Sequence, residues 1–340
     1  MRVLGGRYRL EQCIGVGGMS EVWRGYDEVL ARPVAVKLLA PHEPTGPDAE
    51  ERARTEARAA AQLVHPNVAG VFDFGMAAVA PDRQAPYIVM ELVDGATLAE
   101  HLAAGPMDWD IAVRICAEIS AALAAAHGHD IVHRDIKPAN IMLTPSGAKV
   151  LDFGIATATG QCDPQPAGTV LGTPAYLAPE RIGGRPATPA TDMYSVGVLL
   201  YECLTGRLPW PRRTPTQLLE ASHHTPPAPL PPIDGLAPEA AELCRSCLNE
   251  GPEERPTSLV AALVLAEAVD ARVYVPPVGL PAPPRPPVAS GGSAGSGEHI
   301  GRHRAGPHPA EDRSPAVDRS SPGDWRWHPT EASRPGGGRR

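Results

Sequence analysis

The spacing of apolar and turn-forming residues changes once along the chain, near residue 95, and this change limits the folds that the chain can adopt. Up to residue 92, short β-like runs alternate with Gly and Pro, and one helical segment interrupts them; from residue 97 onward the pattern is mainly helical. The sequence therefore predicts an α+β fold, in which a small sheet with one helix precedes a larger helical body.

The same pattern predicts the individual elements. Strands are expected over residues 8–14, 21–26, 34–39, 68–74 and 87–92, with a loop over residues 77–86. Helices are expected over residues 48–64, 97–104, 109–127, 193–204, 215–221, 238–248 and 257–268.

A change in composition marks a second boundary, after about residue 274. Residues 276–340 contain 13 Pro and 11 Gly and few apolar residues that could anchor a core, so we expect a disordered tail. Within it, residues 281–287 (Pro-Ala-Pro-Pro-Arg-Pro-Pro) either form a polyproline II ligand for the groove of a partner or serve as a solvated spacer.

Charge and hydropathy exclude several classes of protein. With 31 Lys and Arg against 39 Asp and Glu, the net charge is −8, which argues against nucleic-acid binding. The sequence has no uncharged apolar run of about 18 residues, so we expect no membrane span. It also has no apolar signal segment at its start, so we expect a cytoplasmic protein. Six cysteines do not suggest a disulfide scaffold, and Cys244 and Cys247, in a predicted helix, are expected to be buried thiols.

Lysine is rare in this chain. Only three of the 31 basic residues are lysines, namely Lys37, Lys137 and Lys149. Because arginine is the usual basic residue here, a retained lysine indicates a position that needs a compact ammonium group. The alternative is that these are three ordinary surface lysines.

A glycine-rich segment, Ile14-Gly15-Val16-Gly17-Gly18, lies between two predicted strands. Glycines there let backbone N–H groups approach phosphate oxygens without an intervening side chain, although a plain hairpin turn has the same pattern. A dinucleotide-binding fold requires a helix after the glycines, whereas a strand is predicted here. A Walker loop requires Gly-Lys-Ser/Thr, which this segment lacks.

Lys37 lies on a predicted apolar strand, where burial of an ammonium is costly unless an anion lies beside it. Glu56 follows nineteen residues later in the predicted helix and is a candidate partner that would hold the ammonium against nucleotide phosphates. Glu50 and Glu51 lie in the same helix, so the spacing does not single out Glu56.

The centre of the chain carries the most specific motif, His133-Arg134-Asp135-Ile136-Lys137-Pro138-Ala139-Asn140, followed by Asp152-Phe153-Gly154. These residues resemble the catalytic loop and the Asp-Phe-Gly motif of eukaryotic-type protein kinases, and Lys137, two residues after Asp135, is similar to the serine/threonine class. The resemblance continues in order over residues 7–271, with Gly172-Thr173-Pro174, Ala178-Pro179-Glu180, an Asp192 motif and Glu254-Arg255-Pro256. The segment Gly17-Gly18-Met19-Ser20-Glu21-Val22 resembles that of bacterial Hanks-type kinases, particularly actinobacterial ones.

The resemblance implies the bilobal kinase fold, with a kinase domain over residues 7–271, an N-lobe over 7–92 and a C-lobe over 95–271. It implies transfer of the γ-phosphate of ATP to Ser or Thr hydroxyls of proteins, a reaction that depends mostly on positioning and charge neutralisation. Asp135 would orient the substrate hydroxyl and accept its proton, and Lys137 would neutralise charge on the transferring phosphate. Asn140 and Asp152 would hold Mg²⁺, for which Mn²⁺ is an alternative.

The same resemblance implies an ATP site. Lys37 would bind the α- and β-phosphates and pair with Glu56, and the glycine segment, residues 14–18, would cover the phosphates. The residues implied to bind adenine are the gatekeeper Met90, the backbone groups of Glu91 and Val93, and the side chains of Val22, Ala35 and Met142. Lys149 has no such role and is expected to be an ordinary surface residue.

Three further expectations concern the structure of the large lobe. They are a Glu180–Arg255 ion pair, backbone hydrogen bonds from the catalytic loop to Asp192, and stacking of His133 on Phe153.

Arg134 precedes Asp135, and in the family such an arginine marks kinases activated by phosphorylation between the Asp-Phe-Gly and Ala-Pro-Glu motifs. We expect autophosphorylation at Thr169, whose phosphate would add a charge of about −1.5 to −2 and dock on Arg134. A homodimer would allow this reaction in trans. Thr173 is expected to contact Asp135 and Lys137 instead.

Two other functions stay open. A pseudokinase scaffold usually lacks a catalytic Lys or Asp, whereas Lys37, Asp135 and Asp152 are all present. Small-molecule phosphotransferases of related fold lack the Gly-Thr-Pro and Ala-Pro-Glu segments, which this chain has. Many bacterial relatives continue into a membrane helix, and this chain continues into a polar tail. We therefore expect a soluble signal-transduction kinase whose signal arrives through a partner, the tail or dimerisation.

Overall fold

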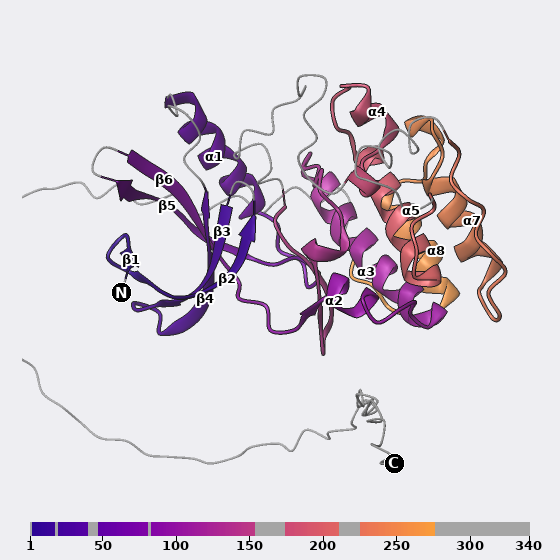
Figure 1. Ribbon diagram of the computed structural model, residues 1–340, viewed down its shortest axis with the longest axis horizontal. Helices are drawn as coiled ribbons and strands as arrows, with labels where there is room; N and C mark the ends of the chain where they lie inside the picture. Colours follow the sequence, from indigo (N-terminus) through magenta and orange to yellow (C-terminus); the bar gives the residue numbers. More distant parts are fainter. Residues whose placement is uncertain are drawn as a thin grey trace, which may run out of the picture. The chain divides into compact units, whose positions relative to one another are not determined.

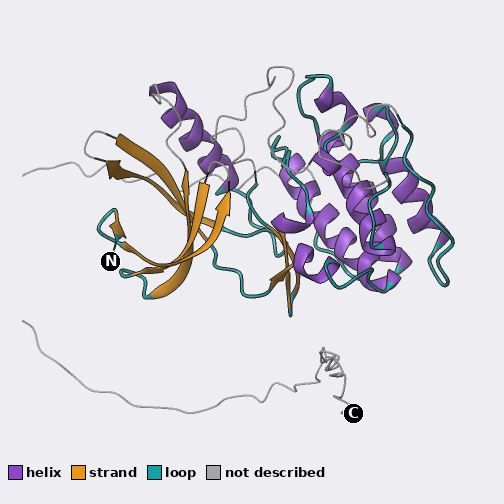
Figure 2. Cartoon of the chain, viewed as in Figure 1, coloured by secondary structure: helices purple, strands orange, loops and turns teal. Residues whose placement is uncertain are grey.

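The computed structural model describes residues 2–17, 20–39, 47–80, 83–153, 174–210 and 225–275 (Figures 1 and 2). All of these residues lie in one of the two units into which the chain divides, Met1–Pro281. Gly18, Thr169 and Thr173, the predicted helix over residues 215–221 and the predicted tail over residues 276–340 lie outside the described residues.

The N-terminal lobe is a six-stranded antiparallel sheet in the order β1-β2-β3-β4-β6-β5, with one helix, α1 (Pro47–Ala60), against β5 and β6 (Figure 1). This arrangement confirms the predicted sheet with one helix, and only the short first strand was not predicted. The strands are β1 (Val3–Leu4), β2 (Tyr8–Gly17), β3 (Ser20–Asp27), β4 (Arg32–Leu39), β5 (Val71–Ala80) and β6 (Arg83–Met90).

The predicted loop over residues 77–86 is wrong, because residues 77–80 belong to β5 and residues 83–86 belong to β6. Ala77 lies opposite Ala85 in the hairpin, and both are buried. Proline breaks most strand ladders, but Pro86 lies opposite Met76 in this hairpin. It lies one residue beyond the last pair of β6 with β4, Leu38 with Tyr87, a position where a missing N–H is tolerated.

The larger lobe is mainly helical, as predicted (Figure 2). A three-stranded sheet in the order β7-β8-β9, which the periodicity did not predict, lies on α3. The helices are α2 (Leu98–Leu102), α3 (Trp109–His127), α4 (Pro179–Ile182), α5 (Pro189–Thr205), α7 (Pro238–Cys247) and α8 (Ser258–Ala268). The strands are β7 (Ala96–Thr97), β8 (Ile141–Thr144) and β9 (Gly147–Val150), and the 3₁₀ turns are η1 (Pro138–Asn140), η2 (Pro174–Tyr176) and η3 (Pro252–Glu254).

Helix α5 begins four residues before its predicted start. Thr188 and Thr191 form a capping box around its first turn, and Pro189 occupies the first helical position, where its missing N–H costs nothing. Gly206 ends the helix with φ 68°, a left-handed conformation that glycine adopts without strain. The early start places Asp192 in the first turn, where the helix dipole favours an anion.

The core of the large lobe forms around α3 and α5, whose residues are mostly buried; α3 packs against both α5 and α8. Cys116, Cys203, Cys244 and Cys247 are free thiols in this core, which confirms the prediction for the last two. Burial raises the pKa of Cys244 to about 12, so this thiol is unreactive at neutral pH. None of the helices in the described residues is long and apolar enough to span a bilayer.

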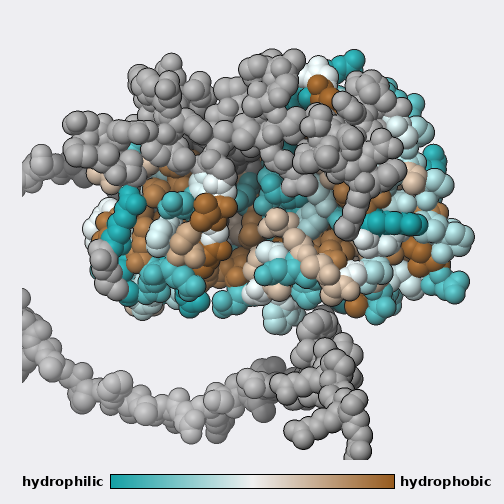
Figure 3. Space-filling view, viewed as in Figure 1, coloured by the Kyte–Doolittle hydropathy of each residue, from teal (hydrophilic) through white to brown (hydrophobic). Residues whose placement is uncertain are grey.

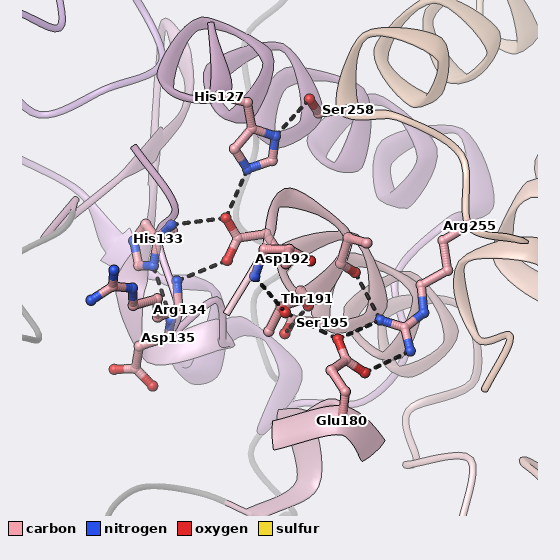
Figure 4. Close-up of polar contacts among 12 residues, drawn as sticks. His127, His133, Arg134, Asp135, Glu180, Thr191, Asp192, Ser195, Arg255 and Ser258 are labelled. Carbon is pink, nitrogen blue, oxygen red and sulfur yellow. Dashed lines mark hydrogen bonds and ion pairs between the residues drawn. The ribbon is translucent and has the colours of Figure 1, made fainter. Parts of the chain in front are cut away.

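A buried ion pair joins α4 to the segment before α8, as predicted (Figure 4). Arg255 donates to both carboxylate oxygens of Glu180, at 2.9 and 2.8 Å. Its other N–H groups donate to the carbonyl oxygens of Ala190, Asn249 and Glu250. Burial alone would raise the pKa of Glu180, but the bonds from Arg255 outweigh it, and the pKa lies below its ordinary value.

We expect the substitution Arg255→Leu to lower the free energy of unfolding by about 3–5 kcal/mol, because Glu180 would remain buried without its partner. Urea denaturation followed by circular dichroism measures this loss. The matched control is Arg245→Leu, since the Arg245–Glu242 pair is exposed to solvent and its removal should leave stability almost unchanged. Equal losses in the two variants would contradict the assignment.

A second buried carboxylate, that of Asp27, organises the turn after β3. Arg7 donates to both of its oxygens, at 2.8 and 2.7 Å, and the N–H groups of Val29 and Leu30 donate to Oδ1. The hydrogen bonds from Arg7 lower the pKa of Asp27 from 3.8 to about 2, against the opposing effect of burial. A carboxyl group whose pKa is depressed on folding stabilises the folded state above its unfolded pKa.

This stabilisation should be present above pH 3.8 and be lost as the pH falls toward about 2. The wild-type protein should therefore lose more stability between about pH 5 and pH 3 than Asp27→Asn, whose amide does not titrate. Urea denaturation of both proteins at several pH values in this range measures the difference. Parallel pH profiles would show that Asp27 has no depressed pKa.

Candidate active site

The buried carboxylate of Asp192 holds the segment that carries the predicted catalytic residues (Figure 4). Its Oδ2 accepts the backbone N–H of His133 and its Oδ1 accepts that of Arg134, each at 2.8 Å, which confirms the prediction for Asp192. His127, at the end of α3, donates from Nε2 to the same Oδ2 at 2.8 Å, and its Nδ1 lies 2.9 Å from Ser258 Oγ. No sequence pattern indicated His127 or Ser258, because they come from helices far apart in the chain.

His133 links the catalytic loop to the segment around residue 152. Its Nδ1 accepts the backbone N–H of Asp135 at 3.2 Å, and its Nε2 donates to the carbonyl of Leu151 at 2.7 Å, a pattern that requires the ring proton on Nε2. The ring meets Phe153 edge-to-face with 4.9 Å between centroids, which confirms the predicted contact. Between His133 and Asp135, Arg134 has φ 71°, a left-handed conformation that is costly for any residue with a Cβ and is maintained by the bond to Asp192.

Asp135, Lys137 and Asn140 form a cluster around one carboxylate oxygen. Lys137 Nζ lies 2.7 Å from Asp135 Oδ2, and Asn140 Nδ2 donates to the same oxygen at 2.9 Å. Asn140 Nδ2 also donates to the backbone carbonyl of Asp135 at 2.7 Å. The loop is thus closed by its own side chains, and the Asp135 carboxylate remains 39% exposed.

Asp152 is tied to this loop through the residue before it. The backbone carbonyl of Asn140 accepts the N–H of Leu151 at 2.9 Å, while His133 binds the Leu151 carbonyl. Asp152 itself has φ 60°. Two predicted site residues seventeen positions apart, Asp135 and Asp152, are therefore held by one hydrogen-bonded framework.

Lys37 reaches this framework from the other lobe. It lies on β4, only 9% of the residue is exposed, and its Nζ is 2.9 Å from Asp152 Oδ2. A buried ammonium requires such an anion. The side chain of Glu56, the partner expected from the sequence, lies outside the described residues, although its backbone belongs to α1.

The described part of the glycine segment, residues 14–17, forms the end of β2 and pairs with the start of β3. Gly15 lies opposite Val22, and Gly17 lies opposite Ser20. Ile14 and Val16 are 50% and 80% exposed. Exposed hydrophobic residues are not confined to this segment, since the face shown in Figure 3 carries them among hydrophilic ones. A strand follows the glycines, which confirms that this is not a dinucleotide-binding turn.

Three of the predicted adenine-binding side chains lie in one apolar cluster on the sheet. Ala35 and Met90 form it with Ile88, and Val22 packs against it. Met142 lies on β8 of the other lobe. Downstream of Met90, the backbone N–H of Glu91 donates to the carbonyl of Gly70 at 2.8 Å, so its carbonyl oxygen is the group that could bind a base.

The prediction that Lys149 is an ordinary surface residue is wrong. Its Nζ lies 2.9 Å from Glu91 Oε1 and its side chain is only 18% exposed. The prediction failed because Glu91 is 58 residues away in the sequence, and only the fold brings β9 to the connection between the lobes.

A surface pocket of about 310 Å³ adjoins Lys137. The hydroxyl of Tyr176 donates to the Glu202 carboxylate in its wall, and burial raises the pKa of Tyr176. No sequence pattern identified this pocket, because its wall comes from four separate elements. Its lining residues are Ala99, Leu102, Ala103, Lys137, Pro138, Ala139, Tyr176 and Glu202.

The oxygen atoms of Asp152 and Asn140 fit a magnesium ion. The bonds of Asn140 use its nitrogen, which leaves the amide oxygen as a ligand, and a carboxylate with an amide oxygen is a hard donor set. The described residues contain no group of three or more His, Cys, Asp or Glu suited to a metal. Two protein ligands suit Mg²⁺, which is usually bound together with substrate phosphates and water.

Comparison with known proteins agrees with this geometry. The protein kinase domain family matches residues 8–269. The serine/threonine-protein kinase PknA of Mycobacterium tuberculosis is 40% identical over 254 residues, which cover 74% of this chain and 58% of PknA. PknL of the same species is 37% identical over 287 residues, which cover 83% of this chain and 70% of PknL. PksC of Streptomyces coelicolor is 40% identical over 262 residues, which cover 74% of this chain and 47% of PksC.

The matched region spans little more than half the length of PknA, and about half of PksC. The match to the protein kinase domain family covers most of this chain and includes both lobes. The chain therefore belongs to the protein kinase family, among the Hanks-type kinases related to actinobacterial Pkn proteins.

Proposed function

We propose that this protein is a serine/threonine protein kinase that transfers the γ-phosphate of ATP to hydroxyl groups of proteins. The convergence of charged groups from both lobes is the observation that carries this proposal. Lys37 from the N-terminal sheet pairs with Asp152, and Asp152 is tied through Leu151 to the loop that holds Asp135. Such positioning of fixed charges is what phosphoryl transfer requires.

Asp135 is the group that orients the acceptor hydroxyl and takes its proton. Lys137 and Asn140 both bind Oδ2, and this leaves Oδ1 to accept the hydrogen bond of the hydroxyl. The two bonds also fix the orientation of the carboxylate. Lys137, 2.7 Å from Asp135, places its positive charge beside the acceptor and neutralises charge on the transferring group.

Lys37 is the cation for the α- and β-phosphates of ATP, with the glycine segment over the phosphates. Adenine binds between the apolar cluster of Val22, Ala35 and Met90 and Met142, with the backbone of Glu91 and Val93 as hydrogen-bonding groups. When bound by Asn140 and Asp152, Mg²⁺ would supply positive charge beside the phosphates. Mn²⁺ would bind to the same two ligands.

The two alternative functions are less well supported. A pseudokinase scaffold has no need for Lys37, Asp135 and Asp152 in one hydrogen-bonded arrangement. A phosphotransferase for small molecules has no need for the segment around Pro179 and Glu180, which is held in place by Arg255.

Proteins with exposed Ser or Thr are the proposed substrates. A homodimer for phosphorylation in trans, a partner for the proline-rich segment, a cytoplasmic location and the absence of nucleic-acid binding remain proposals that rest on the sequence.

We expect Asp135→Asn to lower kcat by about 10²-fold or more, because the acceptor hydroxyl loses its base. The assay follows transfer of radiolabelled phosphate from ATP to a basic protein in the presence of Mg²⁺, with ATP binding measured separately by calorimetry. The matched control is Asp130→Asn, since Asp130 is exposed and has φ 59°, a conformation that Asn tolerates. A wild-type protein that binds ATP but transfers no phosphate would favour the scaffold function.

Autophosphorylation at Thr169 is a second expected outcome. Mass spectrometry of the wild-type protein after incubation with ATP and Mg²⁺ should place a phosphate on Thr169, and the Asp135→Asn protein should carry none. The threonines at positions 157 and 159 serve as internal controls in the same segment. A fully active enzyme without phosphate on this segment would refute the prediction.

A further inference from the structure

The third lysine of the chain occupies a junction between the lobes. Lys149 Nζ lies 2.9 Å from Glu91 Oε1 and 3.0 Å from Oε2, so the ammonium contacts both oxygens of one carboxylate. The same carboxylate accepts the N–H of Gly70 at 3.2 Å, while the N–H of Glu91 donates to the Gly70 carbonyl at 2.8 Å. Glu91 thus binds Gly70 with both its main chain and its side chain, and Lys149 fixes the side chain.

The strand that carries Lys149 also binds the segment before Gly70. Val150 donates its N–H to the carbonyl of Asn67 at 2.9 Å and accepts that of Ala69 at 3.0 Å. The side-chain amide of Asn67 donates to the carbonyl of Ala148 at 2.8 Å. Residues 67–70 are therefore bonded both to strand β9 and to Glu91. The Lys149–Glu91 ion pair adds a direct contact between β9 and Glu91.

This junction lies beside the proposed adenine site. Met90, in the apolar cluster on the sheet, immediately precedes Glu91. Met142 lies directly opposite Lys149 in the β8–β9 ladder, and opposite residues of an antiparallel pair project from the same face of a sheet. The ion pair consequently connects β9, the strand paired with Met142, to the backbone proposed to bind the edge of the base.

We propose that Lys149 is a positioning residue for ATP, which holds the Glu91 backbone in place for adenine through the Glu91 carboxylate. This inference rests on the proposed function. Side chains that are 18% and 33% exposed are screened less than surface pairs. Without Lys149, Glu91 would keep its main-chain hydrogen bond to Gly70 but lose the ion pair to β9. The carbonyl of Glu91 would then be less well ordered for binding adenine.

The test compares Lys149→Met and Lys149→Arg with the wild-type protein. Lys149→Met should raise both the Kd and the KM for ATP·Mg²⁺ by about three- to tenfold, with kcat and the KM for the protein substrate within about twofold. Lys149→Arg keeps a cation within reach of the carboxylate and should bind ATP within about twofold of the wild type. Arg245→Met removes a positive charge from an exposed pair on α7 and should leave all four constants unchanged.

Glu91→Gln provides a second route if Lys149→Met folds poorly, because it keeps the main chain and the size of the side chain. It should raise the Kd for ATP by a similar factor. In the double variant, the Kd for ATP should stay within about twofold of the higher Kd of the two single variants, since both substitutions remove the same interaction. Multiplicative effects of the two substitutions would contradict the inference.

Other results separate this inference from the proposed function. An unchanged Kd for ATP in Lys149→Met, with or without a lower Tm, would reduce Lys149 to a structural residue and overturn the inference. A wild-type protein that binds ATP but transfers no phosphate would refute the kinase activity. The ratio of the Kd for ATP in Lys149→Met to that in the wild type would still decide the role of Lys149. A wild-type protein that does not bind ATP would refute both.

Discussion

The buried carboxylate of Asp192 connects the packing of the large lobe to the geometry of the active site. Helix α5 is mostly buried, and its capped first turn presents Asp192 to two successive N–H groups, those of His133 and Arg134. These bonds satisfy the buried carboxylate and hold Arg134 in its left-handed conformation. The direction of the chain at Asp135 follows from this, so the position of the proposed base depends on how α5 packs.

Two ammonium groups link elements of different lobes. Lys37 extends from the N-terminal sheet to Asp152, and Lys149 extends from β9 to Glu91. The remaining lysine, Lys137, lies within the catalytic loop, where its ammonium group contacts Asp135. All three lysines of a chain that otherwise uses arginine thus contact carboxylates at or beside one site.

Local patterns predicted the elements well where the periodicity was long and uniform. The helix over residues 109–127 has the bounds of α3, because nineteen residues give a clear period and Asp108 precedes the first turn. The loop over residues 77–86 was wrong, because Ala77 and Ala85 pair across the hairpin and are buried, which no local pattern indicated. Lys149 was misread for a similar reason, since its partner is remote in the sequence.

The sequence alone determined the chemistry proposed for this protein: through the family resemblance, the motifs that contain Asp135, Lys137, Asn140 and Asp152 imply a base, cations and hard oxygen ligands, and such motifs are local. Only the tertiary structure decided how these groups are held. The Asp192 bonds to the catalytic loop through the packing of α5, the approach of Lys37 to Asp152 and the tie between Lys149 and Glu91 all join segments between 58 and 115 residues apart. Contacts over such separations depend on which elements share a core, and no local pattern of residues encodes them. Of these contacts only the Asp192 bonds were predicted, and that prediction came from the family resemblance.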